Sequence, residues 1–132
     1  MSEIEIKLAA GTDVGLVRKN NEDNFVVNRD LSQSEWIIPQ SSETIPLGKY
    51  GTLLVVADGM GGTNAGEVAS AIAIETVQNA FTPEKLDKIV TFEGEMATEE
   101  AIEEFLTKTI KAADLNIVNA SKRSEERRVG KE

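Results

Sequence analysis

The chain has 132 residues, 40% of them hydrophobic, a formal net charge of −9, and no cysteine or histidine. This length and composition predict one globular domain or part of one, and the acidic charge argues against nonspecific nucleic-acid binding. Without cysteine or histidine, a cysteine nucleophile, a phosphohistidine intermediate and a thiolate or imidazole zinc site are excluded within this chain. Catalysis here would depend on carboxylates, oxygen-bound metal ions and cationic side chains.

No apolar run approaches the length of a membrane span, so no membrane partner is expected. The acidic N-terminus, Met1 to Glu5, lacks the apolar core of a signal peptide. We therefore expect a cytoplasmic protein, and the lack of cysteine agrees with that compartment.

The first part of the chain has the pattern of strands. Residues 3–10 alternate so that Ile4, Ile6, Leu8 and Ala10 lie on one face, which predicts a half-buried strand. A short strand is expected over 25–28. Residues 29–50 contain two prolines and several serines, and they are expected to form a variable excursion that the segment Trp36-Ile37-Ile38 pins down. Residues 52–57 are expected to form a central strand.

That strand leads from five apolar residues into Asp58 and a glycine-rich turn. An Asp in this place is a metal ligand, a general base or a cap of the turn, and the segment alone leaves these alternatives open. The following glycines also suggest a phosphate cradle before a helix. However, there is no Gly-Lys-Ser/Thr and no correctly spaced GxGxxG, which argues against a nucleotide site.

A second acidic cluster lies upstream, where Arg18 precedes the adjacent pair Glu22 and Asp23 by four residues. Such a stretch on its own is often a solvated polar loop. A fold that brings this pair near Asp58 needs a cation to offset the repulsion. Mg²⁺ and Mn²⁺ take oxygen ligands of this kind, so the two clusters together favour a metal site.

Two segments, Gly11 to Phe25 and Asp58 to Ser70, resemble in order and spacing the motifs of the bacterial metal-dependent Ser/Thr protein phosphatases of the type 2C class. The resemblance runs from about Ile4 to about Ser121, and it reaches only the first half of that family's catalytic domain. It implies hydrolysis of phosphoserine and phosphothreonine on proteins, a cognate Ser/Thr kinase that makes the substrates, and a monomer at full length.

The resemblance also implies roles for individual residues. Asp58 matches the aspartate that bridges two metal ions, Gly59 the carbonyl ligand, and Glu22 and Asp23 the acidic pair beside the metals. Arg18 matches the arginine that holds the substrate phosphate. In the family, a metal-bridging water attacks phosphorus without a covalent phosphoenzyme.

The chain departs from the family pattern in one respect. Many members have a histidine near the Asp-Gly pair, either directly after it or after the glycine pair, and Met60 and Thr63 stand there instead. The metal ligands are unaffected, but the proton for the leaving group would have to come from metal-bound water or from a residue outside this chain.

Beyond the glycine-rich turn the hydrophobic period changes to that of helices. Asn64 and Glu67 resemble a capping box, Pro83 is expected at the first position of a second helix, and a longer helix is expected from Thr98. The apolar stripes of the first and third helices are Val68, Ala69, Ile72, Ala73 and Val77, and Ile102, Phe105, Leu106, Thr109 and Ala113. Antiparallel strands followed by helices predict an α+β fold, here the N-terminal half of the family's four-layer α/β/β/α sandwich.

The last ten residues, 123–132, match the in-frame translation of a common sequencing-library adaptor. Our interpretation is that residues 1–122 are a partial catalytic domain; the alternative is a genuine basic tail on a helix end. A half-domain leaves strand edges unpaired and an apolar face uncovered. We therefore expect an active parent enzyme and an inactive fragment. The rival interpretation is a non-catalytic pseudophosphatase or phosphoprotein-binding module.

Overall fold

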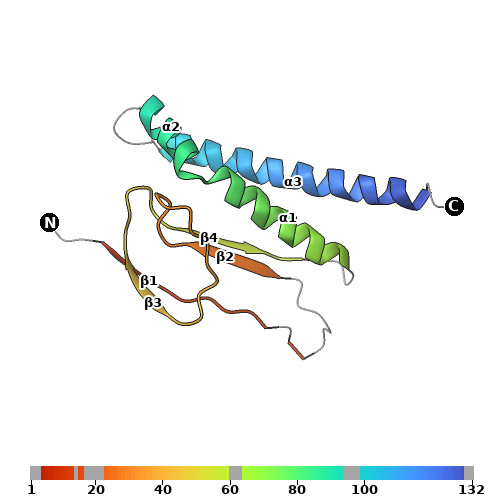
Figure 1. Ribbon diagram of the computed structural model, residues 1–132, viewed down its shortest axis with the longest axis horizontal. Helices are drawn as coiled ribbons and strands as arrows, with labels where there is room; N and C mark the ends of the chain where they lie inside the picture. Colours follow the sequence, from red (N-terminus) through yellow and green to blue (C-terminus); the bar gives the residue numbers. More distant parts are fainter. Residues whose placement is uncertain (1–3, 14, 17–22, 60–63, 94–98, 130–132) are drawn as a thin grey trace.

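The structure is a computed structural model that describes residues 4–13, 15–16, 23–59, 64–93 and 99–129. Within these ranges four strands are followed by three helices. Figure 1 shows the helices on one side of strands β2 and β4, with β1 and β3 on the other side. The predicted α+β class with antiparallel sheets is confirmed. The complete four-layer sandwich stays a prediction.

Strands β1 (Glu5–Leu8) and β3 (Glu43–Pro46) form an antiparallel ribbon in which Ile6 lies opposite Ile45. We expected no strand between residues 29 and 50, so the sequence-based interpretation was wrong at β3. Four residues give too short an alternation to be told from a loop, and their partner lies far away in the sequence. Pro46 suits the end of this strand because proline has no N–H to donate.

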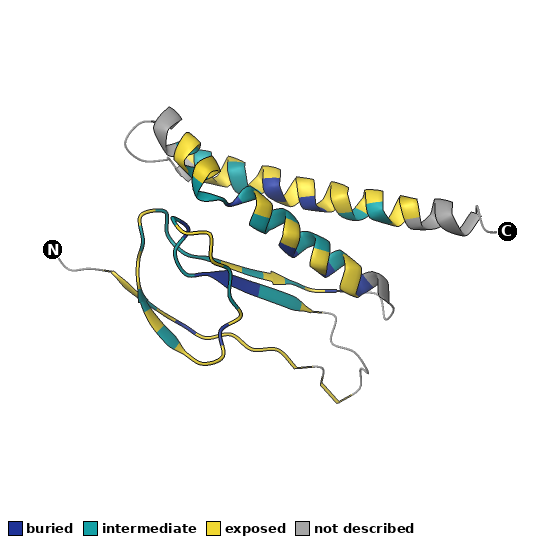
Figure 2. Cartoon of the chain, in the orientation of Figure 1, coloured by how far each residue is buried: buried dark blue, intermediate teal, exposed yellow. Residues whose placement is uncertain are grey.

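Strands β2 (Asn24–Asn28) and β4 (Leu53–Ala57) form the second antiparallel sheet. Their register runs from Asn24 opposite Ala57 to Asn28 opposite Leu53. The C-terminal half of β2 is buried, whereas the burial of β4 alternates along the strand. Among the described strands β4 pairs only with β2, so it lies at an edge and is not the central strand that we expected. The helices cover only one face of this sheet, which explains the alternation (Figure 2).

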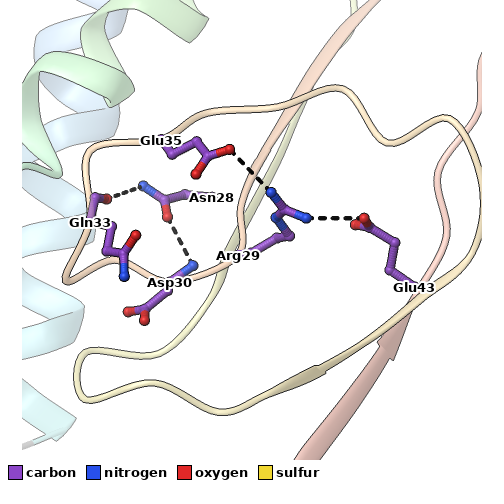
Figure 3. A network of polar contacts seen from close by, with 6 residues as sticks. All are labelled: Asn28, Arg29, Asp30, Gln33, Glu35 and Glu43. Carbon is purple, nitrogen blue, oxygen red and sulfur yellow. Dashed lines mark hydrogen bonds and ion pairs between the residues drawn. The ribbon is translucent and has the colours of Figure 1, made fainter.

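The excursion between β2 and β4 is tied to the body by a polar network (Figure 3). The side chain of Asn28 is 1% exposed; its Nδ2 donates to the carbonyl of Gln33 at 3.2 Å, and its Oδ1 accepts the N–H of Asp30 at 3.0 Å. The guanidinium of Arg29 donates to Glu43 at 3.1 Å and to Glu35 at 3.2 Å. Asn28 therefore satisfies the backbone of a turn that would otherwise bury unpaired groups.

Residues 36–38 were expected to anchor the excursion, and one of the three, Ile37, does so. Ile37 exchanges two backbone hydrogen bonds with Val27, at 2.8 and 2.9 Å. Trp36 is half-buried, and Ile38 is 56% exposed. The backbone of Ile37 therefore carries the attachment, rather than a cluster of three apolar side chains.

Helix α1 (Asn64–Ala80) lies across β2 and β4 and also contacts α3. Ser70 and Ile74 are buried, and four residues of the predicted stripe, Ala69, Ile72, Ala73 and Val77, are half-buried. Val68, the remaining stripe residue, is 51% exposed, so its predicted burial was wrong. The predicted stripe therefore fails only at its first residue, in the N-terminal part of the helix.

Helix α2 (Pro83–Glu93) begins at the expected proline, and the N–H of Lys85 donates to Thr82 Oγ1 at 3.3 Å. Helix α3 (Glu99–Val129) buries Thr109 and Ala113 as predicted, but its Ile102 is 48% exposed. The rings of Phe81 and Phe105 meet edge to face with their centroids 4.8 Å apart. No helix in the described ranges combines the length and apolar character needed to cross a bilayer.

Candidate functional site

The β2–β4 register brings the two predicted acidic clusters to the same end of one sheet. Asn24 lies opposite Ala57 in the last pair of the ladder. Asp23 directly precedes Asn24 and Asp58 directly follows Ala57, so the two aspartates flank this pair on neighbouring strand ends. Opposed positions in an antiparallel pair have Cα atoms about 4.5–5.5 Å apart. The backbones of two acidic residues from distant parts of the sequence therefore lie beside each other at one end of the sheet.

The local sequence explains why Asp58 lies at this end of the sheet. The β-branched and leucine residues of β4 favour an extended chain, with alternate side chains against α1. Gly59, which follows Asp58, is buried. The strand therefore ends with the exposed Asp58 beside a buried glycine.

A groove of about 370 Å³ extends from Asp23 along the sheet. One wall is residues 9–12, and the other is formed by β2 and β4 residues that include Phe25, Leu54 and Val56. The groove lies on the face of the sheet away from α1, because Leu54 and Val56 are exposed there. The carboxylate of Asp23 thus stands at the rim of a mainly apolar groove.

The sequence analysis did not predict the structural role of Asp13 in this region. The carboxylate of Asp13 accepts the N–H of Gly15 at 2.7 Å, and Gly15 has a φ of +81°. Glycine reaches this left-handed conformation without the steric cost that other residues meet. The signal was present as an Asp followed two residues later by Gly, the spacing of an Asx turn.

Two predicted site residues, Arg18 and Glu22, lie outside the described residues. Met60 and Thr63, which stand where many members of the type 2C class have a histidine, lie outside them as well. The structure therefore brings together Asp23, Asp58 and Gly59, and the proximity of Arg18 and Glu22 to them stays a prediction. The helix start at Asn64 agrees with the expected position, but the proposed contact of its side chain is likewise not described.

The donors present suit a hard divalent cation. Asp23 and Asp58 are exposed oxygen donors, and Mg²⁺ or Mn²⁺ bound to few carboxylates keeps several waters. In the described part of the chain no group of three or more acidic residues is placed to hold a metal ion. The two aspartates are thus a partial donor set.

Comparisons with known proteins identify relatives of this chain. Proteins named serine/threonine phosphatase stp from Listeria innocua and from two strains of Listeria monocytogenes are 33% identical to it over 107 residues. The matched segment covers 81% of this chain and 32% of each relative. This chain is a relative of bacterial serine/threonine phosphatases.

The phosphatase resemblance read from the two motifs is therefore confirmed by sequence relatives. The chain spans about a third of the length of the Listeria phosphatases that it matches. No family model matches the chain, and no solved structure matches it. The link to phosphatases therefore rests on sequence identity, and the fold rests on the structure described above.

Proposed function

We propose that this chain carries part of the catalytic domain of a metal-dependent phosphatase that hydrolyses phosphoserine and phosphothreonine on proteins in the cytoplasm. The observation that carries the proposal is the β2–β4 register, which brings Asp23 and Asp58 to one end of the sheet. The names of the Listeria relatives support the reaction class. The two exposed carboxylates support the involvement of a divalent ion.

Each residue has a separate part in this proposal. Asp58, Asp23, Glu22 and the carbonyl of Gly59 would hold two Mg²⁺ or Mn²⁺ ions, which, when bound, supply an activated water and offset charge on the phosphoryl group. Arg18 would bind two phosphate oxygens, since a planar guanidinium matches their geometry. These residues include no cysteine or histidine, so a thiol or imidazole nucleophile from this chain is excluded, and direct hydrolysis by a metal-activated water is the reaction that the phosphatase resemblance implies.

The proposed substrates are phosphorylated proteins made by a cognate Ser/Thr kinase. We also propose that the 132-residue chain alone is inactive. Among its described residues only Asp23 and Asp58 meet at the site, and the match covers only 32% of each Listeria relative. The four ligands proposed above are few for two divalent ions with octahedral oxygen coordination, so we expect the chain alone to bind them weakly.

A non-catalytic phosphoprotein-binding module is the second candidate. It would use the same end of the sheet, and the exposed Asp23 and Asp58 there are compatible with it. A binding module needs the phosphate-holding arginine and tolerates loss of the bridging aspartate. An enzyme needs both residues.

The experiment is a phosphopeptide assay with Mn²⁺ on the protein encoded by the uninterrupted reading frame, beside the 132-residue chain. We expect turnover by the intact protein and none by the chain. Asp58→Asn should lower kcat by at least about 10³-fold, because Asp58 would hold the ions that offset charge in the transition state. Asp114→Asn, an exposed substitution on α3, is the matched control and should leave the rate unchanged. If the full-length protein with Asp58→Asn keeps most of its rate, the metal assignment is refuted. If the unmodified full-length protein binds phosphopeptide without hydrolysing it, the binding module is favoured.

A further inference from the structure

The segment that contains Arg18 begins and ends beside one groove. Thr12, which comes before this segment, and Asp23, which follows it, both line the groove on the face of the sheet away from α1. Figure 1 shows the chain leaving β1 toward the end of the sheet at which β2 begins. Arg18 itself lies outside the described residues, but the chain from Arg18 to Asp23 spans at most about 18 Å. Arg18 is therefore held on a short tether at the end of the sheet where Asp23 and Asp58 lie.

The described start of this segment is a turn that one side chain holds. Asp13 Oδ1 accepts the N–H of Gly15 at 2.7 Å, and Gly15 has a φ of +81°. Packing adds little to this turn, because Leu16 is fully exposed and no described atom lies within 4 Å of a Cβ built at Gly15. The hydrogen bond from Gly15 to Asp13 therefore sets the direction in which the chain continues toward Arg18.

We propose that Asp13 is a positioning residue for Arg18. By closing the turn at Gly15, it limits the directions that the following chain can take, and it thereby favours placement of the guanidinium beside a phosphate group at the end of the β2–β4 sheet. Asp13 acts through a hydrogen bond to the backbone, so an uncharged acceptor of the same shape can replace its carboxylate. The inference rests on the proposed phosphate-binding role of Arg18.

The turn affects phosphate affinity through the cost of ordering the chain. A ligand that binds a flexible segment must offset the conformational entropy that the segment loses. A turn that is already closed in the free protein removes part of that cost before the ligand arrives. One exposed hydrogen bond makes a modest contribution, so loss of the turn is expected to weaken phosphate binding about 3–10-fold.

The opposite end of the β2–β4 ladder provides matched controls. Asp30 closes a turn of the same kind there, because its Oδ1 accepts the N–H of Ser32 at 3.0 Å. Gly51 has a φ of +85°, and no described atom lies within 4 Å of a Cβ built on it. Asp30→Ala and Gly51→Ala therefore disturb a turn in the same two ways as Asp13→Ala and Gly15→Ala, away from the candidate site.

The test measures binding of a peptide in which phosphothreonine is replaced by its non-hydrolysable phosphonate. The protein encoded by the uninterrupted reading frame is titrated with Mn²⁺ present, and Kd is obtained from fluorescence anisotropy. Asp13→Ala and Gly15→Ala should each raise Kd about 3–10-fold. Asp13→Asn, Asp30→Ala and Gly51→Ala should each leave Kd within about twofold of the original value. An unchanged Kd in Asp13→Ala, or a rise of the same size in Asp13→Asn or in the two controls, would overturn the proposal.

A double-mutant cycle with Arg18 separates positioning from a general effect on the fold. Arg18→Ala alone should raise Kd at least about 10-fold, because charge-assisted hydrogen bonds to the phosphonate are lost. Adding Asp13→Ala should then change Kd less than about twofold, since no guanidinium is left to position. Additive effects would refute the positioning role and leave the phosphate-binding role of Arg18 standing. If Arg18→Ala itself had no effect, the proposed phosphate-binding role would be wrong, and the inference with it.

Discussion

Asp23 and Asp58 flank the same residue pair of the β2–β4 ladder, Asn24 opposite Ala57, although 34 residues separate them in the sequence. The register of β2 against β4 places the two aspartates at the same end of the sheet. Their proximity therefore depends on the strand residues that pair, which take no part in catalysis themselves. A slip of one residue would move each side chain to the other face of the sheet. The alternating burial of β4 favours this register, because a slip would turn its half-buried residues Leu53, Val55 and Ala57 away from α1.

Asn28 should be a large contributor to stability for a single polar side chain. It is 1% exposed, and its amide satisfies two backbone groups of the following turn. Asn28→Ala would leave both groups unpaired and should lower the free energy of unfolding by about 2–3 kcal/mol in urea denaturation. Asn119→Ala, on an exposed position of α3, is the control, with an expected change within about 0.5 kcal/mol. Equal effects of the two variants would contradict the network in Figure 3.

Gly48 is predicted to be intolerant of a side chain for a steric reason. A Cβ at this position would lie 2.5 Å from Asp30 Oδ1. Gly48→Ala should therefore destabilise the chain by about 1–3 kcal/mol, measured by thermal or urea unfolding. Gly11→Ala meets no atom within 4 Å and serves as the control.

A double-mutant cycle separates this clash from other causes. Asp30 also accepts two hydrogen bonds from Ser32, at 3.0 and 2.6 Å, so Asp30→Ala has a cost of its own. Once that carboxylate is gone, adding Gly48→Ala should cost little more. Fully additive effects in the cycle would show that Asp30 is not what excludes the side chain.

The contact between Phe81 and Phe105 should join α3 to the rest of the molecule. The rings meet at an interplanar angle of 75°, and Phe81 is buried. Phe81→Ala should cost about 3–5 kcal/mol and Phe105→Leu about 1 kcal/mol, by urea unfolding. Val118→Ala, at a position 41% exposed on the same helix, should cost less than either. If Phe81→Ala were no worse than Val118→Ala, the α1–α3 packing described here would be wrong.

The sequence was sufficient to predict the elements that carry a strong periodic signal. Strands β2 and β4 and the starts of α1 and α2 were placed within a residue or two, because their apolar pattern and flanking glycine, asparagine or proline are local signals. Strand β3 was missed since its pairing with β1 depends on a partner far along the chain. Val68 and Ile102 were predicted as buried, but a stripe does not show where a neighbouring element ends.

The candidate site was predicted in part for the same reason. The two motifs indicated which carboxylates matter, and the resemblance indicated what they do. Only the register shows that Asp23 and Asp58 meet at one end of the sheet. The turn held by Asp13 was missed because the motif suggested no role for that residue. Arg18 and Glu22 lie outside the described residues, so their place at the site is still a prediction.

The basic segment at the end of the chain leads to a prediction about the DNA sequence that encodes it. Residues 123–132 match a translated adaptor, so sequencing the source DNA through codon 122 should show a different continuation. We expect the frame to run on into further motifs that contain aspartate. If genomic DNA encodes Arg123 to Glu132 followed by a stop, the adaptor interpretation is wrong and catalysis would require a partner chain.

The most direct test of the central claim is to localise Mn²⁺ on the chain by NMR. Paramagnetic broadening falls steeply with distance, so a low Mn²⁺ concentration should first broaden the amide signals of Asp23, Asn24, Asp58 and Gly59. Asp58→Asn and Asp23→Asn should each remove that selective broadening, since each takes away a charged oxygen ligand. Asp114→Asn should leave it unchanged. Broadening spread evenly over the acidic surface, or unaltered in Asp58→Asn, would contradict a metal site at this end of the β2–β4 sheet.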